Sequence, residues 1–301
     1  MIICTLAEIG VEGAEIQDHQ PLTEEDKAQM FVDIMPEGPA DDGIAYLNFY
    51  LEEDADKESI LRDVRNALEE LRTFMDIGEG TIEESETEDK DWINNWKEFF
   101  HQFYVDDILI VPSWEEVKEE DKDKMILHID PGTAFGTGMH ETTQLVIRQL
   151  KKYVTRGAEI LDVGTGSGIL GITALKLGAG HVVGTDLDPC AVSAVQDNKE
   201  ANQIEDDSFD MMIGNIIDDV EVQNEVGYER YDIVAANILA DVLVPLTPVI
   251  VHQMKKGAYY ITSGILDVKE EVVREAVEKA GLTLVEVTKQ GEWVCVTARK
   301  D

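Results

Sequence analysis

The chain has 301 residues and carries 63 acidic against 25 basic side chains, a formal net charge of −38 at pH 7. This excess of acidic residues disfavours direct binding of nucleic acid or of an anionic membrane surface, because both require clustered lysine and arginine. It favours a basic protein partner, unless the acidity serves solubility alone. The three cysteines are widely spaced, and no basic leader or apolar run of about 18 residues occurs, so we expect a cytoplasmic protein without a membrane span.

Residues 1–90 are predicted to form a small α/β domain. The segment Ile44–Leu51 alternates apolar and polar residues, as a half-buried strand does, and Asp56–Met75 carries apolar residues at helical spacing. The segment Glu79–Asp91 is dense in acidic residues and almost free of large apolar ones. We therefore expect a domain boundary there.

An aromatic linker region is predicted over residues 91–125. Helical spacing places five aromatic side chains on one face, which indicates packing between domains rather than ligand stacking: Trp92, Trp96, Phe99, Phe100 and Phe103. A short strand is expected at Leu109–Val111, followed by a turn towards Trp114.

Residues 126–301 alternate strand and helix patterns, which predicts an α/β fold with a doubly wound, Rossmann-like sheet. The expected strands are Ile160–Val163, Val182–Asp186, Ile233–Ala236, Tyr259–Thr262, Leu282–Thr288 and Val294–Ala298. The expected helices are Glu141–Tyr153, Ile169–Leu177, Ala191–Ala201, Ala240–Gln253 and Lys269–Ala280. The acidic stretch Glu205–Glu229 is predicted to be an irregular, exposed elaboration.

The most informative segment is a strand that runs into a glycine turn and a helix, ILDVGTGSG at 160–168. Its glycines Gly164 and Gly166 allow a tight turn and close approach of a ligand, and Asp186 at the tip of the next strand can accept both hydroxyls of a ribose. The spacing also fits a dinucleotide fingerprint, which leaves a nicotinamide-dependent dehydrogenase open. Asp162, inside the strand end, favours the charged amino-acid end of S-adenosylmethionine over a pyrophosphate.

Two further segments are expected to lie at the same edge. The loop DPGTAFGTGMHETT ends in a helix whose first turn contains Thr143, so its amides and hydroxyls can hold a polar ligand. His140 and Glu141 do not complete a zinc motif, because position 144 is Gln, and no metal is expected. Asn237 follows a strand and is interpreted as a helix cap, a substrate contact, or both.

These segments together resemble a known enzyme family. DPGTAFGTGMHETT, ILDVGTGSGIL with ALKLGA, GTDLDP and ANILA are similar to the motifs of the bacterial methyltransferases that modify the eleventh protein of the large ribosomal subunit. The linker pattern DKDW…W…PSW and the terminal EWVCVTARK extend the resemblance over residues 85–301, whereas the preceding part resembles the family only in outline.

The resemblance implies methyl transfer from S-adenosylmethionine to lysine side-chain amines and the N-terminal amine of that basic protein, before ribosome assembly. It implies a ferredoxin-like substrate-recognition domain at 1–90, whose opening strand we expect to be absent, and a methyltransferase domain at 126–301. Asn237 is expected to orient the amine. The predicted cofactor-binding residues are Thr143, Asp162, Gly164, Gly166, Asp186 and Asn237. A methyltransferase of the same fold that acts on another protein or on a small molecule remains the alternative.

Overall fold

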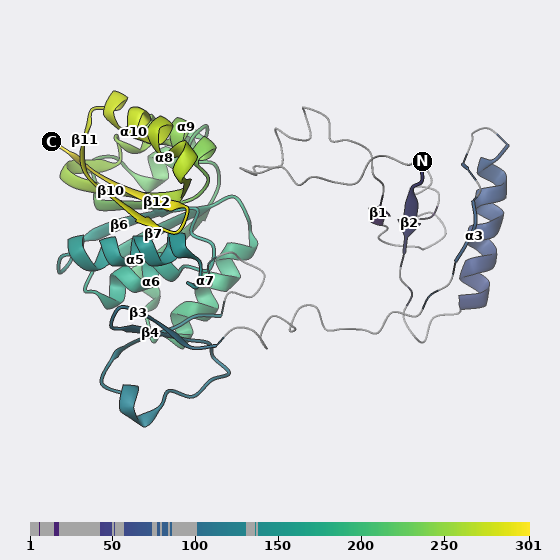
Figure 1. Cartoon of the computed structure of the whole chain (residues 1–301), viewed down its shortest axis with the longest axis horizontal. Helices are drawn as coiled ribbons and strands as arrows, with labels where there is room; N and C mark the ends of the chain where they lie inside the picture. Colours follow the sequence, from purple (N-terminus) through teal and green to yellow (C-terminus); the bar gives the residue numbers. More distant parts are fainter. Residues whose placement is uncertain are drawn as a thin grey trace. The chain divides into compact units, whose positions relative to one another are not determined.

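The computed structural model describes residues 6, 15–17, 43–49, 51, 57–73, 77–78, 80–83, 85, 101–130, 136 and 138–301. The chain divides into two compact units, Met1–Glu88 and Asp89–Asp301, both drawn in Figure 1. Within the described part, no helix combines the length and the apolar character needed to cross a bilayer.

The smaller unit contains two short antiparallel strands, β1 (Glu15–Gln17) and β2 (Tyr46–Asn48), and the helix α3 (Lys57–Leu71). The helix buries one apolar face, as its periodicity predicts, and Val64 packs in a small core with Leu6. The ferredoxin-like order of this unit and its expected missing strand concern positions that lie largely outside the described residues.

The larger unit is built on a seven-stranded sheet with the order β11-β12-β10-β9-β6-β7-β8. Its strands are β6 (Glu159–Val163), β7 (His181–Asp186), β8 (Phe209–Ile213), β9 (Tyr231–Asn237), β10 (Met254–Leu266), β11 (Leu282–Gln290) and β12 (Trp293–Lys300). Strands β6 to β10 run parallel, and β12 lies antiparallel between β10 and β11. The predicted α/β class is confirmed, and the sheet is mixed because a tight turn at Gly291 reverses the chain into β12.

Helices cover both faces of this sheet. They are α5 (Glu141–Tyr153), α6 (Ile169–Lys176), α7 (Cys190–Ala201), α8 (Val220–Val226), α9 (Ala240–Ile250) and α10 (Glu270–Lys279), with short 3₁₀ turns at Glu119–Asp121, Asp206–Ser208 and Asp267–Lys269. Successive side chains of a strand point to opposite faces. Ile160 therefore joins a core with α5, α6 and α7, whereas Leu161 joins one with α8, α9 and α10. Figure 1 shows the two helical layers on either side of the strands.

A second, three-stranded sheet precedes the main one and consists of β3 (Phe103–Val105), β4 (Ile108–Val111) and β5 (Met125–His128). β3 pairs antiparallel with β4, and β4 pairs parallel with β5. The prediction that Phe103 continues a helical aromatic face is wrong, because this residue opens a strand. The other aromatic residues of that predicted face, at 92–100, lie outside the described residues.

The acidic stretch Glu205–Glu229 is not an irregular elaboration, so that prediction is also wrong. It supplies β8, at one edge of the main sheet, and the helix α8, whose first amides are capped by Asp219. Phe209 and Val226 are buried from this segment. The predicted helix from Ala240 also ends earlier, at Ile250, and it contains two prolines.

Candidate functional site

The candidate site lies where β6 and β9 end side by side. β6 pairs with β7 on one side and with β9 on the other, and the helices that follow β6 and β9 pack on opposite faces of the sheet. Ligands of open α/β sheets bind outside the carboxyl ends of the strands at such a switch point. Asp162, Gly164 and Asn237 all occupy this position.

The glycine turn after β6 is fixed by backbone hydrogen bonds to the end of β7. The amides of Gly164 and Thr165 donate to the carbonyl of Thr185, over 2.8 and 3.2 Å. Gly164, Gly166 and Gly168 have φ values of +73°, +53° and +80°, a region in which an L side chain is strained. The turn then feeds α6, with Gly168 at its N-cap.

Asp162 is completely buried behind this turn. Its Oδ2 accepts the amide of Gly171 over 3.1 Å, whereas its Oδ1 accepts no hydrogen bond from any described residue. Burial raises the pKa of the carboxyl to about 7, against a small opposing effect of the Gly171 amide. An unpartnered buried acceptor is costly, and a ligand that brings a positive charge or an N–H donor would relieve that cost.

Asp186 ends β7, as predicted, and its carboxylate organises the neighbouring backbone. Oδ2 accepts the amide of Gly166 over 2.8 Å, and Oδ1 accepts the amide of Asp188 over 2.9 Å. Each carboxylate oxygen has two lone pairs, so both can accept a further hydrogen bond. The side chain therefore supports the glycine turn and keeps the capacity to bind a diol.

Thr143 and Asn237 meet across the site, although they are 94 positions apart in the chain. Asn237 Nδ2 donates to Thr143 Oγ1 over 3.2 Å, and Asn237 Oδ1 is buried without a partner among the described residues. The N-cap position of α9 belongs to Leu239 and has no side-chain cap. The interpretation of Asn237 as a helix cap is therefore wrong, and its amide oxygen is free to receive a donor at the strand edge.

Ile238 fixes the backbone next to Asn237. A Cβ on Gly164 would lie 2.4 Å from Ile238 Cγ2, and a Cβ on Gly264 would lie 2.4 Å from the Ile238 carbonyl oxygen. Both distances are shorter than any real Cβ contact, so each glycine makes room for this residue. The Ile238 amide also donates to the Ser263 carbonyl over 3.1 Å. Ile238 is thereby wedged between the end of β6 and the bulge in β10, which holds Asn237 in place.

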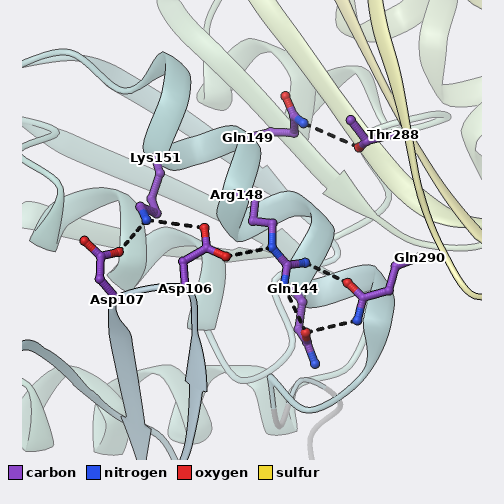
Figure 2. Close-up of polar contacts among 8 residues, drawn as sticks. All are labelled: Asp106, Asp107, Gln144, Arg148, Gln149, Lys151, Thr288 and Gln290. Atoms are coloured by element: carbon purple, nitrogen blue, oxygen red, sulfur yellow. Dashed lines mark hydrogen bonds and ion pairs between the residues drawn. The ribbon is translucent and has the colours of Figure 1, made fainter.

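The helix α5, which carries Thr143, is anchored on its outer side by a polar network (Figure 2). Arg148 donates to Asp106 over 3.1 Å and to Gln290 over 2.6 Å, and Lys151 contacts both Asp106 and Asp107. These partners belong to the β3–β4 turn and to the end of β11. The network thus joins α5 to both sheets of the larger unit.

Sequence reasoning did not identify Ser167 or the partners of the preceding glycine loop. Ser167 Oγ donates to the carbonyl of Gly136 over 2.7 Å, which ties that loop to the glycine turn. Its place between two glycines of the turn was an available signal. No feature of the sequence indicated the close contact between Ile238 and Gly264, because nothing in the sequence pairs positions so far apart.

The residues present fit the predicted cofactor. At one edge they combine two buried acceptors that have no partner among the described residues, on Asp162 and Asn237, with a carboxylate on Asp186 and a backbone shaped by glycines. S-adenosylmethionine offers an ammonium group and a ribose diol, which match such acceptors. The arrangement suits a ligand with a cationic end and a sugar.

Known proteins of one family are similar to this chain. The family model described as ribosomal protein L11 methyltransferase (PrmA) matches residues 1–301. The ribosomal protein L11 methyltransferase of Agathobacter rectalis is 55% identical over 98% of this chain and 93% of its own length, and that of Lachnospira eligens is 56% identical over 100% and 95%. The crystal structure of a ribosomal protein L11 methylase from Lactobacillus delbrueckii subsp. bulgaricus is 31% identical, with a TM-score of 0.60, over 67% of this chain and 100% of that one.

Proposed function

The chain belongs to the ribosomal protein L11 methyltransferase family, and we propose that it transfers methyl groups from S-adenosylmethionine to amines of ribosomal protein L11. Family membership makes it an S-adenosylmethionine-dependent methyltransferase and decides against the dehydrogenase that the glycine spacing left open. The proposed acceptors are lysine side chains and the N-terminal amine, on L11 that has not yet joined the ribosome.

One observation supports the proposal at the level of individual residues. Asn237 has its amide nitrogen bonded to Thr143, and its amide oxygen is buried without a partner in the part of the chain that the structure describes. The bond to Thr143 orients the amide and leaves its oxygen available at the strand edge. An amine that enters at this edge would find an acceptor already oriented for its N–H.

The chemistry divides between cofactor and protein. When bound, S-adenosylmethionine supplies an electrophilic methyl group for in-line transfer to a nucleophile. The task of the chain is to align the amine and exclude water. We propose that Asp162 and Asp186 hold the cationic and ribose ends of the cofactor, together with the backbone of Gly164 and Gly166. Thr143 and Asn237 complete the proposed cofactor site, and Asn237 also faces the incoming amine.

The amine must be neutral to attack, and a lysine has an ordinary pKa of about 10.4. The strong negative charge of the chain, −38, favours the protonated form and opposes the reaction. Desolvation in the site favours the neutral form. An asparagine oxygen accepts a hydrogen bond without adding a negative charge, so Asn237 can orient the neutral amine without restoring its proton. A carboxylate at this position would do the opposite.

The proposal is tested by methylation of defined substrates. Purified protein and isotopically labelled S-adenosylmethionine are incubated with free recombinant L11 and, separately, with assembled large subunits, and the products are mapped by peptide mass spectrometry. We expect methyl groups on lysines and the N-terminal amine of free L11, and few on assembled subunits. Equal labelling of both would contradict the proposed timing. Binding of the cofactor without any labelling of L11 would point to another protein or to a small molecule as substrate.

A further inference from the structure

Two asparagines at the C-terminal end of α7, Asn198 within the helix and Asn202 at its C-cap, bond to the backbone of His128, the last residue of β5, and of Asp130, two residues further on. Asn202 accepts the amide of His128 over 2.9 Å and donates to its carbonyl over 2.5 Å. Asn198 accepts the amide of Asp130 over 2.8 Å and donates to its carbonyl over 3.2 Å. Alternate residues of a strand present their backbone groups to the same side, and side chains four apart on a helix lie on one face. The spacing of His128 and Asp130 along the extended chain therefore matches the spacing of Asn198 and Asn202 along the helix end.

Asn198 makes one contact that Asn202 lacks. Its Nδ2 also donates to the carbonyl of Ser167, in the glycine turn, over 2.8 Å. The side chain is completely buried, and both of its amide hydrogens and its oxygen are engaged. Asn202 instead uses its remaining hydrogen on the carbonyl of Asn198, within the same helix. Only one of these two side chains thus reaches the cofactor site.

The contacts of Ser167 extend this link. Its hydroxyl holds the carbonyl of Gly136, while its carbonyl is held by Asn198. Asp130, on the other side of Asn198, receives the backbone amide of Ser113 on its carboxylate over 2.8 Å. Asn198 therefore stands between the small sheet and the turn that faces the cofactor, and it bonds to the backbone of both.

We propose that Asn198 is a positioning residue, which sets the conformation of the glycine turn for S-adenosylmethionine by tying Ser167 to the end of β5. This positioning role rests on the proposed function only through the cofactor, and not through the identity of the methylated protein. If L11 proved not to be the substrate, the effect of Asn198 on cofactor binding would be unchanged.

The test compares Asn198→Ala with Asn202→Ala, a matched control on the same helix and the same strand edge. Both variants lose buried hydrogen bonds to β5, and both should have a lower thermal midpoint. Only Asn198→Ala frees the Ser167 carbonyl, and we expect its calorimetric Kd for S-adenosylmethionine to rise about tenfold or more. The Kd of Asn202→Ala should stay within about twofold of the original value. In the ligand-free protein, hydrogen exchange at the Asp130 amide should accelerate in Asn198→Ala.

A second substitution covers the case in which the alanine variant does not fold. Asn198→Asp keeps the size and the acceptor for the Asp130 amide, but it replaces the donor by an oxygen that faces two carbonyls. The same rise in Kd is expected. An unchanged Kd in either Asn198 variant would overturn the proposal. An equal rise in Asn202→Ala would overturn it as well, because the loss would then follow from general destabilisation.

Discussion

Replacing Asp162 by asparagine should stabilise the ligand-free protein in alkaline solution and weaken its affinity for S-adenosylmethionine. In the folded state the pKa of this buried carboxyl is raised from 3.8 to about 7. Between these pH values the folded state holds a proton that the unfolded state has lost, so the stability that this group contributes falls as pH rises. Once the carboxyl is ionised in both states, the cost reaches about 4 kcal/mol.

Asparagine removes this pH-dependent cost but introduces a constant one. Its oxygen can still accept the Gly171 amide, which Asp162 Oδ2 accepts now. Its NH2 group would take the place of an oxygen that has no partner among the described residues, at a cost of about 1–3 kcal/mol. We expect a net gain of roughly 1–3 kcal/mol near pH 8.5. Between about pH 5 and pH 8.5 the advantage of the variant should grow by roughly 2–3 kcal/mol, and the constant cost cancels from that comparison.

The assay is denaturant unfolding of the ligand-free protein at several pH values, for the original chain and for Asp162→Asn. The exposed Asp197 supplies the control, because Asp197→Asn removes the same charge from the surface. A stability difference that stays constant between pH 5 and pH 8.5 would refute the reasoning. Calorimetry should show weaker binding of S-adenosylmethionine by Asp162→Asn, since a neutral amide replaces the negative charge proposed to face its cationic end.

Three further outcomes are expected. Asp186→Ala should raise the Kd for S-adenosylmethionine ten- to a hundredfold, the equivalent of about 1.5–3 kcal/mol for a charged hydrogen-bond partner, and should lower the thermal midpoint, because the amides of Gly166 and Asp188 lose their acceptor. A Kd that does not change would remove Asp186 from the site. Asn237→Ala should lower kcat as well as cofactor affinity, because an orienting contact is felt in the transition state; a normal kcat at saturating cofactor would limit this residue to binding. The association rate with L11 should fall as salt rises from 0.01 to 0.15 M, over which the Debye length shrinks from about 30 to about 8 Å, and a rate insensitive to salt would mean that the acidic charge does not attract the substrate.

The local pattern of the sequence was sufficient to predict the elements that carry the site. The helix Glu141–Tyr153 has the predicted bounds, and the strand before the glycine turn starts one residue earlier than expected, at Glu159. The helix has apolar residues at helical spacing, and the strand is a short apolar run that ends at a glycine turn. Gly164 has a positive φ that other residues avoid.

The predictions that proved wrong also have local causes. In the segment Phe209–Ile213 only Phe209 is deeply buried, because this strand lies at the edge of the sheet. The segment therefore shows little of the apolar pattern that predicts a strand, and the acidic residues around it favoured the prediction of an exposed loop. Phe103 continued a helical spacing by coincidence, since aromatic spacing alone does not show where a helix stops. The contact between Thr143 and Asn237 could not be predicted at all, because periodicity assigns a residue to a face without naming its partner.

The place of β8 in the sheet gives a physical role to the acidic residues around it. Among the described strands, β8 has a neighbour on one side only, β7, and a bare strand edge is a template to which another chain can add. Asp210 lies in this strand with a side chain 59% exposed, and Glu205, Asp206 and Asp207 precede it. Two copies that met edge to edge would bring these carboxylates together, and their mutual repulsion opposes the growth of one continuous sheet through successive molecules. We therefore expect the negative charge at this edge to oppose edge-to-edge pairing of two copies.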